Sequence, residues 1–216
     1  MKRTSLSFCF FLVSAICAHA DEIAVWNFND GTLNVSRATR TATLTTSFNS
    51  GDVSFSSGST VNARGGDPAG QALELEDKAN NGRDLTWFVS TQGYSSIRVS
   101  FAVRGTSTGF NSNAFLYTVD GGVSWLTFSS FTPSSAFATQ AFDLSGIAAL
   151  NDNPLAGFRV IFNGATSATG NNRIDNLVVE GQLDPSPVAV PELATLLLFG
   201  TGMMGAISVK RFRKII

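Results

Sequence analysis

Histidine and cysteine are almost absent from this 216-residue chain. The one histidine, His19, and the two cysteines, Cys9 and Cys17, all lie within the first 20 residues. The remainder therefore has neither an imidazole nor a thiol, which excludes Ser-His-Asp and Cys-His catalysis, zinc sites built on His or Cys, and disulfides. A domain without disulfides must be stabilised by its own hydrophobic core, and the chain is long enough for one core of ordinary size.

Positive charge is also scarce once the two ends are set aside. Residues 21–190 keep nine of the 15 cations and fifteen of the 16 carboxylates, which gives a net charge of −6. Because phosphate binding needs a cationic face, we expect no nucleic acid partner.

The C-terminus contains the longest apolar run. Residues 193–209 carry no charge and would span about 25 Å as a helix, near the short limit for crossing a bilayer. Four cations follow at once and match the positive-inside pattern: Lys210, Arg211, Arg213 and Lys214. We predict a transmembrane helix over 193–209 and a basic stop over 210–216. The alternative is a buried C-terminal helix, which would be expected to show a polar face.

The motif Val190-Pro191-Glu192 precedes this apolar run. Motif, apolar run and basic end together resemble the PEP-CTERM sorting signal of Gram-negative bacteria, with Leu193 in place of the family's second proline. The resemblance implies that residues 190–216 anchor the chain transiently in the inner membrane. It also implies that an exosortase cuts near the motif and passes the body to the cell surface or to the exopolysaccharide of a biofilm matrix.

The N-terminus predicts export. Lys2 and Arg3 precede an apolar segment at residues 6–16, and Ala18 and Ala20 have the A-x-A spacing of a signal peptidase site. We predict a signal peptide over residues 1–20. The alternative is a lipoprotein acylated at Cys17, but Ile16 just before it is too bulky for that signal.

The body alternates apolar and polar residues with the period of a β-strand. In residues 96–104, Ile97, Val99, Phe101 and Val103 point one way, whereas Arg98 and Arg104 point the other way and are expected to pair with carboxylates. Further strands are predicted over 23–28, 42–48, 53–55, 72–76, 84–90, 114–119, 125–128, 138–143, 158–162 and 174–180, with a short helical turn only within 143–154.

Many short strands separated by Gly- and Asn-rich turns indicate an all-β fold, an antiparallel two-sheet sandwich over residues 21–182. A Pro-rich linker over 183–189 would hold it away from the membrane in an extended form. The order of segments 26–29, 67–73, 94–104, 117–125, 158–160 and 173–179 resembles bacterial extracellular jelly-roll domains related in fold to carbohydrate-binding modules. The resemblance implies a fold and an extracellular setting, and no single ligand.

Calcium is the only metal that the oxygen donors of the body suit. In similar jelly rolls, an acidic residue near the first strand and an Asp in the last strand share a structural Ca²⁺. The resemblance points to Asp30 and Asp175, with Asn27 and Asn176 as further ligands. The alternative is that Asp175 accepts backbone hydrogen bonds at a sheet edge.

Residues 118–125, Thr-Val-Asp-Gly-Gly-Val-Ser-Trp, fit the Asp-box pattern of sialidase propellers. Asp120 can accept N–H bonds across a turn, and Gly121 and Gly122 can take positive φ. The box occurs once and the body has no histidine. We therefore predict a structural hairpin and not sialidase chemistry.

Two further groups of side chains suggest ligand chemistry. Glu74 and Glu76 share one strand face beside Asp77, at a spacing of about 7 Å that inverting glycosidases use. The alternatives are a solvated strand face and a calcium ligand set. Trp87, Tyr94 and Trp125, with Tyr117, could stack on sugar rings, although aromatic residues in sandwiches more often belong to the core.

The sequence thus predicts an exported protein with signal peptidase, exosortase and the membrane as processing partners. Its expected role is non-catalytic, structural or adhesive, with weak binding of extracellular polysaccharide left open. No cofactor is expected apart from the candidate structural calcium. The alternative function is a carboxylate-based glycan hydrolase.

Overall fold

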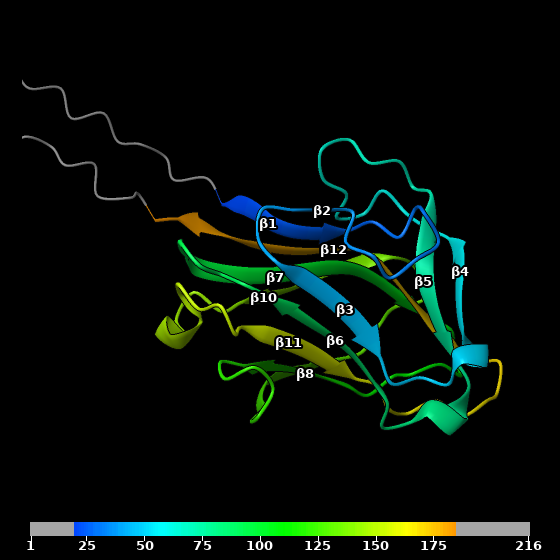
Figure 1. Cartoon of the computed structure of the whole chain (residues 1–216). Coiled ribbons are helices and arrows are strands. Elements are labelled where there is room, and N and C mark those ends of the chain that lie inside the picture. Colours follow the sequence, from blue (N-terminus) through cyan, green and yellow to red (C-terminus); the bar gives the residue numbers. More distant parts are fainter. Residues whose placement is uncertain (1–19, 185–216) are drawn as a thin grey trace, which may run out of the picture. The chain divides into compact units, whose positions relative to one another are not determined.

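The computed structural model describes residues 20–184, which form a sandwich of two antiparallel β-sheets (Figure 1). The larger sheet has the order β10-β7-β12-β1-β2, with β5 paired to β12 and β4 paired to β5. Its strands are β1 (Asp21–Trp26), β2 (Arg37–Ala38), β4 (Val53–Ser57), β5 (Gln71–Glu76), β7 (Tyr94–Gly105), β10 (Ala138–Asp143) and β12 (Asn171–Leu183).

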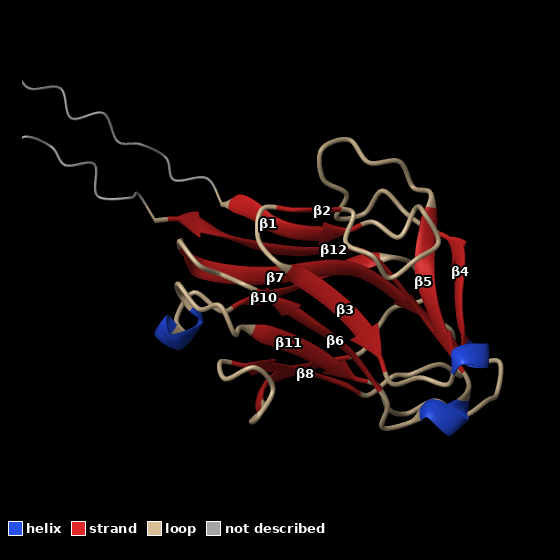
Figure 2. Ribbon diagram, in the orientation of Figure 1, coloured by secondary structure: helices blue, strands red, loops and turns tan. Residues whose placement is uncertain are grey.

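The smaller sheet has five strands in the order β3-β6-β11-β8-β9. They are β3 (Ala42–Thr46), β6 (Asp84–Val89), β8 (Asn113–Thr118), β9 (Leu126–Phe131) and β11 (Gly157–Ile161). The only helices of residues 20–184 are three short 3-10 turns, η1 (Ser50–Asp52), η2 (Lys78–Asn80) and η3 (Ala148–Leu150) (Figure 2). No helix in this part of the chain is long and apolar enough to cross a bilayer.

The predicted two-sheet sandwich is confirmed, and β7 shows why the pattern was informative. Ile97, Val99, Phe101 and Val103 are all buried, as their alternation predicts. The opposite face is less exposed than an alternating strand suggests, because Ser100 and Ala102 are buried as well. The loop after β4 contacts Ser100, because the Asn62 Nδ2 donates to the Ser100 Oγ over 3.1 Å.

Aromatic rings join the two sheets. Phe115 of β8 stacks on Phe142 of β10 with ring centroids 3.8 Å apart and planes at 3°. Trp26 of β1 and Trp87 of β6 are fully buried in the same core. A core of this kind fits a domain that has no disulfide to stabilise it.

β12 lies at the centre of the larger sheet and pairs with β7, β1 and β5. Its first half pairs with β5 and its second half with β1, so the sheet forks between them. The register to β7 shifts between Asp175 and Val178, and Asn176 has a φ of 49°. Asp175 and Asn176 therefore form a β-bulge at the fork, where a bulge re-aims side chains.

The described domain begins and ends at one place, because Asp21 of β1 pairs with Gly181 of β12. β12 extends through Leu183, the first residue of the predicted linker. The predicted signal peptide up to His19, the rest of the linker, the sorting motif, the membrane helix and the basic stop lie outside the described residues.

Candidate functional site

The Asp-box forms the predicted hairpin between β8 and β9. Asp120 accepts hydrogen bonds from the Ser124 N–H over 3.0 Å and from the Ser124 hydroxyl over 2.5 Å. The Thr118 hydroxyl donates to the same carboxylate over 2.6 Å. Gly121 and Gly122 have φ of 75° and 93°. The bonds from Ser124, followed by that from Thr118, hold the pKa of Asp120 well below its ordinary value. The box is a structural turn.

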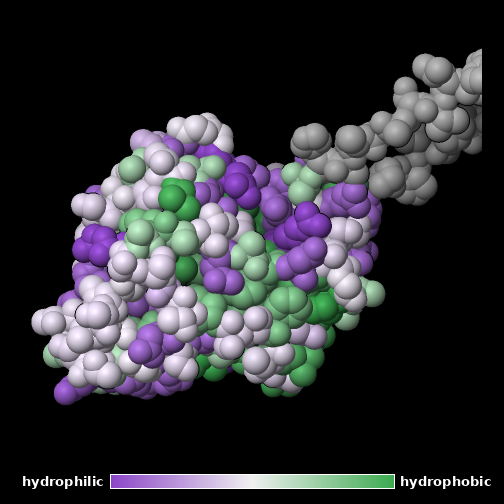
Figure 3. All heavy atoms as spheres, turned by 180° about the vertical axis from the view of Figure 1, so that it is seen from behind, coloured by the Kyte–Doolittle hydropathy of each residue, from purple (hydrophilic) through white to green (hydrophobic). Residues whose placement is uncertain are grey.

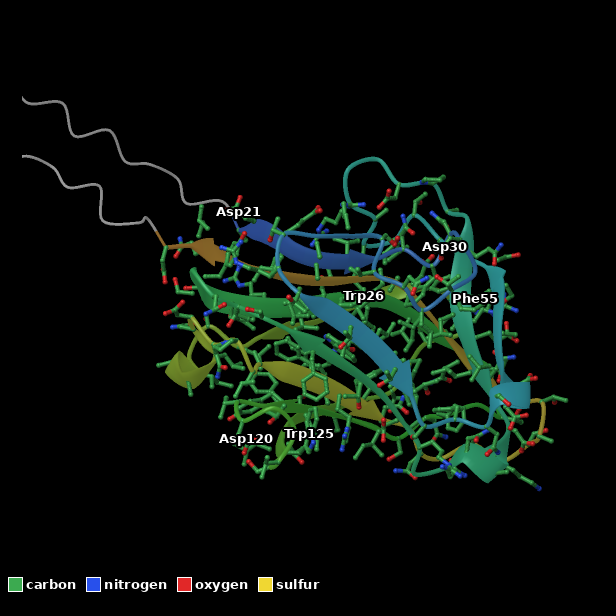
Figure 4. All side chains as sticks on the ribbon, in the orientation of Figure 1. Asp21, Trp26, Asp30, Phe55, Asp120 and Trp125 are labelled. Atoms are coloured by element: carbon green, nitrogen blue, oxygen red, sulfur yellow. The ribbon has the colours of Figure 1, made fainter. Side chains whose placement is uncertain are left out.

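Trp125 is held beside this hairpin on the outside of the smaller sheet (Figure 4). The Arg159 guanidinium lies 4.0 Å from the centre of its ring, and the Phe88 ring centroid lies 6.1 Å from it. The Arg159 Nε also donates to the Thr86 hydroxyl over 2.8 Å. Trp125 is half-buried, and the guanidinium covers one face of the ring. Only part of the ring is therefore open to a ligand.

Trp87 and Tyr94 cannot serve as sugar platforms, and the prediction is wrong for both. Trp87 is 0% exposed and packs against Phe115 and Phe158. Tyr94 is 5% exposed, and its hydroxyl lies 3.0 Å from that of Thr39. The hydrophobic effect places such large apolar surfaces in the core of a sandwich that has no disulfides.

The carboxylates of β5 do not form an open pair. Glu74 lies opposite Arg173 of β12, whose Nε is 2.5 Å from the Glu74 Oε2, and the Ser56 hydroxyl donates to the same oxygen. Asp77 caps η2 by accepting from the Ala79 N–H over 2.9 Å. Glu74 and Asp77 thus have structural partners, which disfavours catalysis. Only 12% of the Glu74 side chain is exposed, so the alternative of a solvated strand face is also wrong for Glu74.

The two predicted calcium ligands accept protein hydrogen bonds. Asp30 closes a turn by accepting from the N–H and the hydroxyl of Thr32. Asp175 is 0% exposed and accepts from the backbone N–H groups of Ser59 (2.7 Å) and Asn176 (2.8 Å). Asp175 therefore accepts backbone hydrogen bonds, as the alternative to calcium binding predicts. It does so at the fork of the sheet and not at an outer edge.

Burial decides the ionisation of Asp175. Desolvation raises its pKa to about 7, and the nearby Asp67 acts in the same direction, whereas the two N–H bonds lower the pKa.

The other two predicted calcium ligands, Asn27 and Asn176, also take part in protein hydrogen bonds. Asn27 accepts from the Asn29 N–H, and Asn176 donates to the Ser59 and Val61 carbonyls. Residues 20–184 contain no group of three or more His, Cys, Asp and Glu side chains placed to hold a metal ion. The structural calcium site at Asp30 and Asp175 stays a prediction.

A groove with both charged and apolar lining residues crosses the outside of the larger sheet over β10, β7 and β12. We call it the outer groove, with a volume of about 410 Å³, lined among others by Arg98, Ser100, Ala141, Asp143 and Glu180. A cavity of about 240 Å³ next to it shares Arg98 and adds Ser96, Ser145 and Gln182. No local pattern in the sequence indicates this groove, because its residues come from three strands that only the fold brings together.

Charges of both signs line the outer groove. Arg98 lies 3.3 Å from the Asp143 carboxylate, and Arg64 lies 3.3 Å from that of Glu180. Ser145, followed by Arg98, holds the pKa of Asp143 below its ordinary value. The expected pairing of Arg98 is therefore confirmed. Arg104 differs, because its guanidinium lies 6.0 Å from the Phe137 ring centroid and it takes part in none of the ion pairs among residues 20–184.

Comparison with known proteins gives structural likenesses at low identity. No family model and no curated protein matches the chain. A xylan-binding module from Paenibacillus barcinonensis is 10% identical, with a TM-score of 0.47, over 79% of this chain and 100% of the module. The adhesin domain of a Lys-gingipain from Porphyromonas gingivalis is 12% identical, with a TM-score of 0.46, over 75% and 99%.

A family 29 carbohydrate-binding module in complex with mannohexaose is 11% identical, with a TM-score of 0.44, over 75% of this chain and 92% of the module. At TM-scores below 0.5, these likenesses assign no ligand and no binding residue to the chain. The sequence of the two ends and the geometry of residues 20–184 are what bear on the function of this chain.

Proposed function

We propose that this chain is an exported protein that an exosortase sorts to the cell surface or extracellular matrix, where its sandwich has a non-catalytic, structural or adhesive role. The observation that carries the proposal is the C-terminal order of a Pro-Glu motif at 190–192, an uncharged run at 193–209 and a basic end. The signal-peptide pattern of residues 1–20 agrees with it.

The fold supports this use of the two ends. Asp21 and Gly181 are partners in one ladder, so the sandwich is held at one end by neighbouring strands. A single stalk after Leu183 would then suffice to attach the domain. The loops at the opposite end of β12, near Asn171, would stay free for contacts with the matrix.

The outer groove favours binding of polysaccharide as an accessory property. The Arg98 guanidinium can donate to sugar hydroxyls, whereas Asp143 and Glu180 can accept from them. The groove has no exposed aromatic platform among the residues named above, and each of these charges already has a partner. Both features favour weak binding of a neutral glycan over tight binding.

The alternative of a glycan hydrolase requires a carboxylate that can donate a proton in a cleft. The Glu74 carboxylate already contacts the Arg173 guanidinium and the Ser56 hydroxyl, and these contacts compete with that role. Glu74→Gln tests the alternative directly. Hydrolysis of a polysaccharide by the natural chain, abolished by this substitution, would replace the non-catalytic proposal.

Mass spectrometry of the protein recovered from its own cells is the decisive test of sorting. We expect a chain that begins at Asp21 and ends close to Glu192. A double substitution, Pro191→Ala with Glu192→Ala, should leave the C-terminus uncut, while the matched change Pro187→Ala, in the linker, should not. A natural chain that still ends at Ile216 would contradict sorting and indicate a plain membrane anchor.

A glycan array with residues 21–184, with and without calcium, tests the accessory property. Binding should weaken by several-fold in Arg98→Ala and be unchanged in Arg83→Ala, which changes another exposed arginine. No binding to any glycan would leave only the structural or adhesive role.

A further inference from the structure

Five large apolar side chains are strongly exposed in residues 20–184, and four of them gather at one end of the sandwich. These are Val123 (88% exposed), Leu126 (53%), Leu155 (55%) and Leu183 (53%). Val123 lies in the turn between β8 and β9, Leu126 begins β9, Leu155 precedes β11, and Leu183 ends β12. We call these four residues the apolar end.

Hydrogen bonds connect the segments that carry these four residues. Leu183 pairs with Tyr94, whose carbonyl accepts from the Asp152 N–H over 2.9 Å. The Asn153 Nδ2 donates to the Val119 carbonyl over 2.9 Å, and the Gly121 N–H donates to the Leu155 carbonyl over 3.1 Å. The loop before β11 thus ties the Asp-box hairpin to the start of β7, which pairs with the end of β12.

The figures agree with this placement. Asp120 and Trp125 lie at the same end of the sandwich as Asp21, where the described chain starts (Figure 4). Seen from behind, hydrophobic residues gather in the lower right part of the surface, on the half that holds this end (Figure 3). The apolar end and the point where the described chain leaves the sandwich are therefore close together.

The chemistry of this end suits a lipid interface. No residue from Gly121 to Phe142 is charged. Trp125, half-buried, lies between Val123 and Leu126, and tryptophan is enriched at the boundary between lipid and water. Charges of both signs lie beside this end: Asp120 in the hairpin, Arg159 over the Trp125 ring and Arg40 over the Tyr94 ring. A zwitterionic surface therefore fits better than an anionic one.

The length of the chain beyond the sandwich decides what covers this surface. Only nine residue steps separate Asp184 from Leu193, where the apolar run begins. Fully extended, they reach about 30 Å. A tether this short keeps the apolar end at a high local concentration beside any membrane that holds the run, so a weak intrinsic affinity is enough for contact.

We infer that the apolar end rests on the zwitterionic lipid surface of the membrane that holds residues 193–209, until the chain is cut near Glu192. The inference rests on the proposed function, because it requires that run to be in the bilayer. It adds an orientation: the end with the hairpin and the loop before β11 faces the lipid, and the outer end of the sandwich faces away. After cleavage, the tether no longer favours this contact.

The three tryptophans provide the test. Trp26 and Trp87 are 0% exposed, so only Trp125 can come into contact with lipid. The chain from Asp21 to Ile216 is inserted into vesicles of phosphatidylcholine brominated on its acyl chains. We expect quenching of up to about one third of the emission, the share of one tryptophan in three. Val123→Ser with Leu155→Ser should abolish most of this quenching.

A matched pair of changes at the far end provides the control. Ala79→Ser with Ala168→Ser alters two exposed residues near the start of β12 and should leave the quenching unchanged. Flotation of the vesicles reports separately on insertion, so a chain that does not float contradicts the proposed function. A chain that floats with no quenching overturns the inference alone. Quenching that falls as the protein-to-lipid ratio rises would indicate that a second copy covers the apolar end, and would also overturn the inference.

Discussion

Asp120 in the β8–β9 hairpin and Asp175 at the fork of β12 accept similar hydrogen bonds in opposite surroundings. Asp120 accepts from the Ser124 N–H and two hydroxyls on an exposed turn. Asp175 accepts from the N–H groups of Ser59 and Asn176 while fully buried. The pKa is lowered in the first and raised to about 7 in the second. Desolvation therefore outweighs two backbone hydrogen bonds at the fork.

The two sites also differ in the sequence separation between each aspartate and its hydrogen-bond donors. Asp120 and Ser124 are four residues apart, whereas Asp175 and Ser59 are 116 apart. The hairpin is a local structure that can form early and open easily. The fork exists only when β12, β5 and the loop after β4 are all in place. We therefore expect changes at the fork to affect the stability of the whole domain.

A pH titration of stability should show the largest effect. Between the ordinary pKa of 3.8 and about 7, folded Asp175 keeps a proton that the unfolded chain has released. This contribution is complete below about pH 4 and is lost as the pH rises through 7, a decrease of up to roughly 4 kcal/mol. Urea unfolding between about pH 4 and pH 8 measures it. Asp175→Asn should flatten the slope, and an unchanged slope would assign it to another group.

Gly58→Ala should have the second-largest effect on the stability of the domain. A Cβ at this position would lie 2.6 Å from the Asp175 Oδ2 and closer still to the Ala69 carbonyl oxygen, which is backbone and cannot easily move. We expect a loss of about 3 kcal/mol in the free energy of unfolding. Gly51→Ala is the matched control, because nothing lies within 4 Å of its Cβ. Equal stability of the two variants would show that the fork is not tightly packed.

Glu74→Gln extends the test to the ion pair that joins β5 to β12. The pair is mostly buried, with 12% and 24% of the Glu74 and Arg173 side chains exposed. We expect a loss of about 1 kcal/mol in thermal or urea unfolding. Glu76→Gln, which takes part in none of the five ion pairs of residues 20–184, should change stability less. A larger loss of stability in Glu76→Gln than in Glu74→Gln would mean that the ion pair contributes no stability beyond the packing of its side chains.

Asp120→Ala should have the smallest effect on the stability of the domain, because the hairpin is exposed and its hydrogen bonds join residues close together in the chain. Its lowered pKa predicts a stabilising contribution that is present above about pH 4 and lost as the pH falls below that value. Thermal unfolding of Asp120→Ala, Ser124→Ala and the double variant would measure the coupling of the two side chains. Additive losses would show that the hydrogen bonds of the box contribute independently, contrary to the geometry.

Much of the fold could be predicted from the sequence. The strand at 138–143 has the predicted bounds, and the hairpin at 118–125 has the positive φ values that its two glycines indicate. The prediction was less successful for the site. Trp87 and Trp125 look alike in sequence, but one is in the core and the other lies beside an arginine on the surface. An alternating pattern shows that a strand has two faces without showing which later segment will cover one of them.

The sequence by itself determined the all-β character, the Asp-box turn, the net charge of the body and the export and sorting signals that we propose at the two ends. Each of these depends on residues that are close together in the chain or on composition alone. Only the tertiary structure decided that Asp175 is buried, that Glu74 pairs with Arg173, and that the outer groove and the apolar end exist. These features join strands and loops far apart in sequence, and their energies come from desolvation and packing that no local pattern contains.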